Sequence, residues 1–120
     1  MTRPLVVKLT CGAEAPERAS QAFTVAATAL AAGAAVSLWL TGEAVWFATP
    51  GGADDIVLQH SPPLADLRDA VLADGTLTVC TQCAARRGLG EPDFPAEVRI
   101  AGAASFVAEA LAPDAQALVY

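Results

Sequence analysis

Short apolar runs alternate with helix-like runs along the whole chain, and this alternation constrains the possible fold most strongly. Strands joined by helices favour parallel pairing, because a parallel partner is reached only by a long crossover connection. We therefore expect an α/β fold in which helices cover both faces of a mainly parallel sheet. The expected strands are 5–9, 36–40, 76–79, 98–100 and 117–120, and the expected helices are 16–32, 44–48, 63–72, 82–87 and 103–112.

Residues 1–120 are expected to form a single domain, because no repeat, low-complexity tract or composition change divides them. Hydrophobic residues make up 54% and charged residues 17%, which indicates that other subunits cover part of the surface. The net charge of −6, with no basic cluster beyond Arg86-Arg87, argues against nucleic acid and anionic membranes as partners. Trp46, Phe47 and Phe94 are candidates either for subunit contacts or for the core.

Residues 19–42 carry no charge, so this stretch has to be weighed as a membrane span. It is mainly small and weakly polar, Gly33 interrupts it, and its periodicity changes after that glycine. A helix, a turn and a strand explain it better than a membrane span. Near the N-terminus the apolar run ends at once in Lys8, which is not the pattern of a secretory signal. We therefore expect a cytoplasmic, thiol-reducing compartment.

A Cys-x-x-Cys motif, Cys80 to Cys83, lies where the third expected strand gives way to a helix. A thiol at that junction is near the positive end of the helix dipole and near unpaired backbone N–H groups, both of which favour thiolate over thiol. Thiolate is the form that attacks or carries sulfur. The motif therefore indicates sulfur chemistry.

Two further features follow expected strands and so reach the same edge of the sheet as Cys80. Cys11 follows the first strand, and Thr41-Gly42-Glu43 follows the second. In open α/β sheets, ligands and reactive groups gather at the carboxyl ends of the strands. Neighbouring strands lie roughly 5 Å apart, so we expect Cys11 and Cys80 to lie one or two strand spacings from each other.

Residues 80–89, CTQCAARRGL, resemble the C-x-x-C-x-x-x-R-G signature of the DsrE/DsrF-like (YchN/TusD-type) family. The order of elements across nearly the whole chain is similar too, with an acidic-Ala-Val turn at Glu43 after the second strand. The resemblance implies a three-layer α/β/α domain with a five-stranded mainly parallel sheet. It also implies assembly into homo-trimers or homo-hexamers, and transfer of sulfur as a cysteine persulfide between donor and acceptor proteins of a relay.

Within this resemblance, Cys80 matches the acceptor cysteine of the relay members, and Cys83 matches the second cysteine of the YchN-like branch. Arg87 and Gly88 match the Arg-Gly pair of the signature. Cys11 has no place in the family pattern. The resemblance implies that sulfur is carried on Cys80, and whether the chain turns over substrate as a sulfurtransferase stays open.

The roles of several of these residues stay open at this point. Cys83 either resolves Cys80 as a disulfide or packs as a small hydrophobe. The two arginines, Arg86 and Arg87, either act on the thiol or form surface ion pairs. Glu43 either orients a thiol or ligand or caps the short helix that follows it.

Other classes of function remain as rivals to the sulfur carrier. The Cys80/Cys83 pair suits thiol–disulfide exchange, although thioredoxin-like motifs usually follow the first strand. A non-catalytic oligomeric module that binds a small ligand is a third possibility. Metal binding by the three cysteines and His60 lacks a second Cys-x-x-Cys or a His pair, and no glycine-rich phosphate motif is present, so we expect neither metal nor cofactor.

Overall fold

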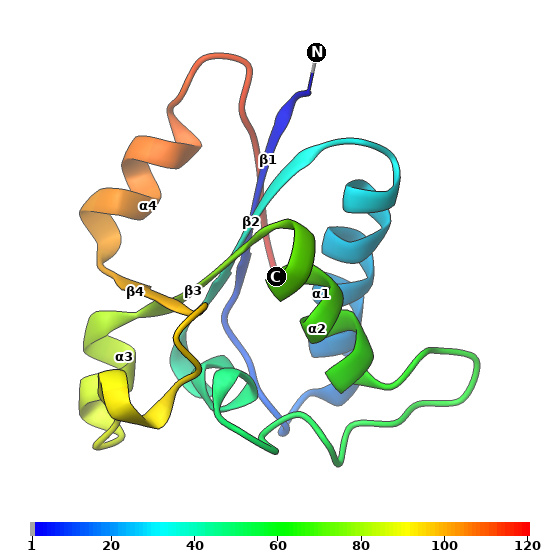
Figure 1. The fold of residues 1–120 in the computed structure, drawn as a ribbon, viewed down its shortest axis with the longest axis vertical. Coiled ribbons are helices and arrows are strands. Elements are labelled where there is room, and N and C mark those ends of the chain that lie inside the picture. Colours follow the sequence, from blue (N-terminus) through cyan, green and yellow to red (C-terminus); the bar gives the residue numbers. More distant parts are fainter. Residues whose placement is uncertain (1) are drawn as a thin grey trace.

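All five strands of the central sheet run parallel, in the spatial order β4-β3-β2-β1-β5. The computed structural model describes residues 2–120, and Figure 1 shows its sheet edge-on between two layers of helices. The strands are β1 (Pro4–Leu9), β2 (Ala35–Leu40), β3 (Thr76–Cys80), β4 (Arg99–Ala101) and β5 (Gln116–Val119). The expected α/β fold with a five-stranded sheet is confirmed.

Helices cover both faces of the sheet, as the alternation predicts. The helices α1 (Pro16–Ala31) and α2 (Leu64–Asp74) pack on each other over one face, and α4 (Ala103–Ala110) lies over the other (Figure 1). The short helix α3 (Thr81–Arg86) and the 3₁₀ helices η1 (Gly42–Ala48) and η2 (Glu91–Asp93) lie beyond the carboxyl ends of the strands. The three layers are therefore α1/α2, the sheet, and α4.

Large apolar side chains hold the two helical layers on the sheet. Phe23 of α1 meets Phe47 of η1 edge to face at 5.9 Å between ring centroids, and both are buried. On the other face, Trp39 of β2 meets Phe106 of α4 edge to face at 5.5 Å. Such pairs add about 0.5–1.5 kcal/mol beyond the area they bury. Of the aromatic side chains with two expected roles, Phe47 and Phe94 belong to the core, whereas Trp46 is 39% exposed.

The uncharged residues 19–42 fold as expected, as most of α1, a turn at Gly33 and strand β2. Gly33 has a φ of 95°, which favours glycine at the end of α1. Within residues 2–120, no helix has both the length and the apolar character needed to cross a bilayer. The short helix predicted at 44–48 is a 3₁₀ helix that begins two residues earlier, at Gly42.

Candidate functional site

The carboxyl ends of three adjacent strands bring together the residues singled out in the sequence. Cys11 follows β1 and Cys80 ends β3, and because β2 lies between them these strands are two spacings apart, within the expected range. Glu43 follows the strand between them. Cys80 and Cys83 are partly exposed, and all three cysteines are free thiols.

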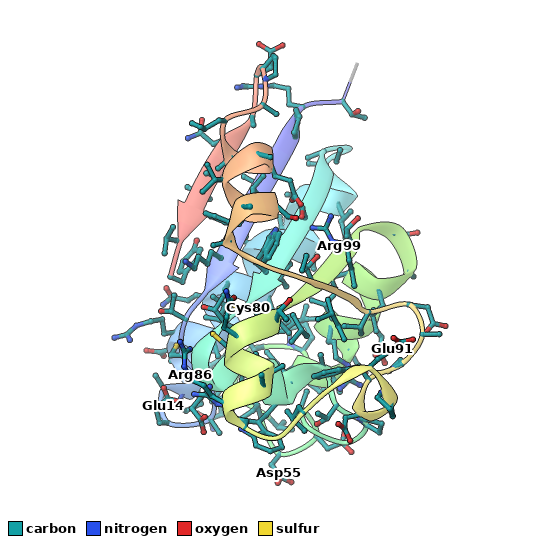
Figure 2. The ribbon with its side chains drawn as sticks, turned by 90° about the vertical axis from the view of Figure 1, so that its left-hand side faces the viewer. Glu14, Asp55, Cys80, Arg86, Glu91 and Arg99 are labelled. Atoms are coloured by element: carbon teal, nitrogen blue, oxygen red, sulfur yellow. The ribbon has the colours of Figure 1, made fainter. Side chains whose placement is uncertain are left out.

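Cys80 is the last residue of β3 and the residue that precedes the first turn of α3. It pairs in register with Ala101 of β4, so the sheet fixes its backbone on one side. Its Sγ donates to Oε1 of Gln82 at 3.5 Å. Figure 2 shows Cys80 between α3 and α4, at the end of the sheet. The thiol is thus held by regular structure and partly open to solvent.

Cys83 lies one turn further along α3, where several groups favour its thiolate. Burial alone would raise the pKa of this thiol, but hydrogen bonding to the Gly42 backbone, the neighbouring Cys80 side chain, and the positive charges of Arg86 and Arg87 lower it from its ordinary value of 9.0. The Arg86 guanidinium lies 3.9 Å from the Cys83 Sγ. These groups therefore favour the thiolate form of Cys83 beside Cys80.

Two glycines allow the turns after β1 and β2 to lie close to each other. Gly42 has a φ of 56°, and a Cβ on it would lie 2.8 Å from the Thr10 carbonyl oxygen. A Cβ on Gly12 would lie 2.7 Å from the Glu43 carbonyl oxygen. The turns after β1 and β2 therefore pack backbone against backbone, with no room for side chains at these two positions.

Glu43 and Arg87 form an ion pair, with 2.5 Å between Oε2 and Nε. Arg87 also donates from a terminal nitrogen to the Cys83 carbonyl at 3.0 Å. Arg87 therefore forms one of the ion pairs expected for it, and its charge also contributes to the lowered pKa of Cys83. Glu43 makes no side-chain hydrogen bond that caps η1, so its contact with Arg87 replaces the expected cap.

Gly88 ends α3 through two backbone hydrogen bonds. The Gly88 N–H donates to the Ala85 carbonyl, and the Leu89 N–H donates to the Ala84 carbonyl. This pairing is the Schellman motif, which needs a left-handed residue after the helix, and Gly88 has a φ of 71°. The glycine of the signature therefore sets where α3 stops and where Arg87 lies.

The surroundings of Cys11 and His60 differ from those of the Cys80/Cys83 pair. Cys11 is 4% exposed, belongs to the hydrophobic core and donates weakly from Sγ to the Ala15 carbonyl at 3.9 Å. His60 is exposed, with a φ of 65°, in the loop between η1 and α2. Within residues 2–120, the His, Cys, Asp and Glu side chains form no group of three or more suited to a metal ion. A binding role for Cys11 stays a prediction.

A small cavity beside Cys80 contains residues that the sequence did not single out. Its volume is about 50 Å³, and we call it the Cys80 cavity. Its walls come from β1, β2, β3 and α4, and Lys8 is its charged residue. The sequence feature that could have indicated this cavity is Lys8, a single lysine within an apolar strand. The cavity is lined by Lys8, Trp39, Thr41, Cys80, Ala103 and Phe106.

Comparisons with known proteins agree with this architecture. The model of the DsrE/DsrF-like family matches residues 5–116. The solved structure of the YchN protein from E. coli superposes with a TM-score of 0.79 at 15% identity, with both chains covered completely. The structure of MTH1491, a protein of unknown function from Methanobacterium thermoautotrophicum, gives a TM-score of 0.71 at 8% identity, covering 98% of this chain and 99% of that one. The search of curated proteins finds no significant match.

Proposed function

We propose that this chain, which belongs to the DsrE/DsrF-like family, carries sulfur as a persulfide on Cys80. Membership of the family indicates a role in sulfur relay in general. The observation that supports the specific proposal is the position of Cys80, a partly exposed free thiol at the carboxyl edge of the sheet with a second thiol one turn away. Ligands and reactive groups gather at this edge in open α/β sheets.

Loading is a transfer between sulfur atoms with no net oxidation. The Cys80 thiolate attacks the outer sulfur of a donor persulfide, R–S–SH, and forms a new S–S bond. The donor S–S bond breaks, and its electron pair leaves with the donor as the thiolate R–S⁻. The reverse reaction, with the thiolate of an acceptor protein as the nucleophile, discharges the carrier. Donor and acceptor proteins are therefore partners in the proposal.

Cys83 supports this chemistry in two ways. The pKa of Cys83 is lowered and Cys83 lies beside Cys80, so the Cys83 thiolate can take the proton that Cys80 must lose before it attacks. It can also attack the inner sulfur of a Cys80 persulfide. That attack forms a Cys80–Cys83 disulfide and expels hydrosulfide, HS⁻, and a cellular dithiol then has to reduce the disulfide. Loading needs Cys80 alone, whereas release of hydrosulfide needs both thiols.

The test is intact-mass analysis of the reduced protein after exposure to a low-molecular-weight persulfide. We expect the wild-type chain to gain the mass of one sulfur atom, Cys80→Ser to gain none, and Cys83→Ser to gain it and keep it longer. An adduct that persists in Cys80→Ser contradicts the assignment to Cys80. No adduct in the wild-type chain contradicts the carrier proposal and favours the ligand-binding module.

Thiol–disulfide exchange is the second candidate, because Cys83, a thiol whose pKa is lowered, lies beside Cys80 in the Cys-x-x-Cys motif. A low thiol pKa stabilises the reduced form of such a pair and makes its disulfide a better oxidant. Equilibration with glutathione buffers, read by alkylation of the remaining thiols, measures the potential of the pair. A Cys80–Cys83 disulfide that forms reversibly at the glutathione redox potential of the cytosol, in a protein that gains no persulfide, favours exchange over sulfur carriage.

The proposal includes a homo-oligomer, a trimer or a hexamer, in a thiol-reducing cytoplasm. Exposed apolar side chains on α4, directly after it and on the edge strand β5 support it: Val107 is 49%, Leu111 79% and Val119 65% exposed. A second copy of the chain would cover this surface. Light scattering on the wild-type chain and on Leu111→Lys tests it, and a wild-type monomer contradicts it.

A further inference from the structure

The Cys80 cavity differs from the surroundings of Cys83, because it lies on the face of the sheet that α4 covers. Lys8 of β1 is in register with Trp39 of β2, and Trp39 is in register with Thr78 of β3. Side chains two residues further along a strand point to the same face, so Cys80 lies on the same face as Lys8. The pleat of three adjacent strands thus brings the lysine and the thiol to one cavity.

Lys8 is the group in this cavity that remains free to meet an anion. Its Nζ lies 5.0 Å above the Phe106 ring centroid, which places its charge against an aromatic face. The salt bridges found among residues 2–120 involve arginines, so no described carboxylate neutralises Lys8.

The other polar groups of the lining already have partners. The Thr41 hydroxyl donates to the Leu9 carbonyl at 3.0 Å, and the Trp39 Nε1–H donates to Glu109 at 3.1 Å. Glu109 in turn accepts from Arg99. The charge that an incoming ligand would meet beside Cys80 is therefore the positive charge of Lys8.

The size of the cavity restricts the ligand. A water molecule needs on the order of 10–15 Å³ of such space, and the cavity offers about 50 Å³. It therefore admits an anion of two or three atoms beside the thiol and excludes a nucleotide or a drug-sized molecule. The aromatic rings of Trp39 and Phe106 give it polarisable walls that suit sulfur.

We propose that the Cys80 cavity binds a small sulfur anion, hydropolysulfide, with Lys8 as the cationic binding residue, an inference that rests on the sulfur-carrier function proposed above. In the simplest case the Cys80 thiolate attacks one sulfur of HS–S⁻, forming Cys80–S–S⁻ and expelling HS⁻. Atoms and charges balance, since two negative charges enter and two remain. Lys8 attracts the incoming anion and stabilises the outer sulfur of the product.

The first experiment measures charge selectivity at Cys80 and does not depend on sulfur transfer. Iodoacetate is an anion and iodoacetamide is its neutral analogue, and peptide fragmentation assigns each label to Cys80. We expect Lys8→Met to lower the ratio of the iodoacetate rate to the iodoacetamide rate by about three- to tenfold, and Lys8→Arg to restore it. Arg18→Met, which changes the net charge equally at an exposed position of α1, should leave the ratio unchanged.

A measurement on the wild-type chain keeps the inference testable if Lys8→Met fails to fold. Attraction by a partly exposed charge such as Lys8 is screened by salt, so the same ratio at Cys80 should fall as the salt concentration rises. A ratio that is independent of salt in the wild-type chain overturns the role of Lys8. A ratio that is unchanged in folded Lys8→Met also overturns it.

The second experiment separates this inference from the proposed function. Reduced protein is exposed to hydropolysulfide, and the gain of sulfur at Cys80 is followed by mass. If the wild-type chain gains no sulfur, the carrier function fails, whatever the alkylation ratio shows. If the wild-type chain and Lys8→Met gain it at the same rate, only the inference about the cavity fails. We expect Lys8→Met to gain sulfur about three- to tenfold more slowly.

Discussion

Glu43 and Arg87, which are 44 positions apart in the sequence, form an ion pair between η1 and the end of α3. The Glu43 side chain is 51% exposed, so solvent screens the pair and its contribution to stability is small. Its effect is on position, because Arg87 also holds the Cys83 carbonyl. The pair thus keeps α3 beside the turn that presents the Gly42 N–H to Cys83.

Arg86→Met should raise the pKa of Cys83. The guanidinium lies 3.9 Å from the Cys83 Sγ, and its positive charge favours the thiolate. Without that charge, the effect of burial, which raises the pKa, is offset by fewer groups. The rate of alkylation at Cys83, measured against pH, should show its midpoint at higher pH than in the wild-type chain. Arg18→Met is the matched control, and an unchanged midpoint in Arg86→Met would show that Arg86 does not act on this thiol.

Gly12→Ala should destabilise the fold by about 1–3 kcal/mol. Its new Cβ would lie 2.7 Å from the Glu43 carbonyl oxygen, and a backbone neighbour cannot rotate away. Urea denaturation measures the loss. Gly90→Ala is the control, since its Cβ would meet no atom closer than 3.9 Å. Equal stability of the two variants would contradict the close packing of the turns after β1 and β2.

Glu109→Gln should lower stability at neutral pH by about 1–2 kcal/mol and lose this effect in acid. Burial alone would raise the pKa of Glu109, but hydrogen bonds from Arg99, Ser37 and Trp39 and the charge of Arg99 lower it from 4.5. The unfolded chain therefore binds the proton more tightly, so the contribution of Glu109 is complete above pH 4.5 and disappears as the pH falls through the folded pKa.

Urea denaturation across this pH range follows the difference between wild type and Glu109→Gln. The exposed Glu97→Gln is the control, and its effect on stability should be small at every pH. A difference in stability between wild type and Glu109→Gln that stays constant down to strong acid would mean that the ionised Glu109 carboxylate does not stabilise the packing of α4 on β2.

Cys11 should resist alkylation in the folded protein, whereas Cys80 and Cys83 should react. Its side chain is 4% exposed and packs in the core, and the other two thiols are partly exposed. Mass analysis after iodoacetamide treatment should show label on the motif cysteines alone, and added urea should expose the third thiol. Labelling of Cys11 in the native protein at the rate of Cys80 would revive its predicted role as a binding residue.

Local sequence was sufficient for most of the elements and for the motif that defines the site. Apolar runs closed by turn residues located the five strands, because burial and backbone preference act over a few residues. The position of Cys80 at the end of a strand and of Gly88 at the end of a helix followed in the same way. The 3₁₀ start at Gly42 was missed, since it depends on the contact of that glycine with the Thr10 backbone.

The sequence by itself determined that parallel strands alternate with helices and that two thiols lie at a strand-to-helix junction, because both properties come from neighbouring residues. Only the tertiary structure decided the strand order, which brings Lys8 of β1 to the same cavity as Cys80 of β3. It also decided that the Gly42 backbone hydrogen-bonds to Cys83, a contact that lowers the pKa of Cys83. These contacts join residues distant along the chain, so no local pattern encodes them.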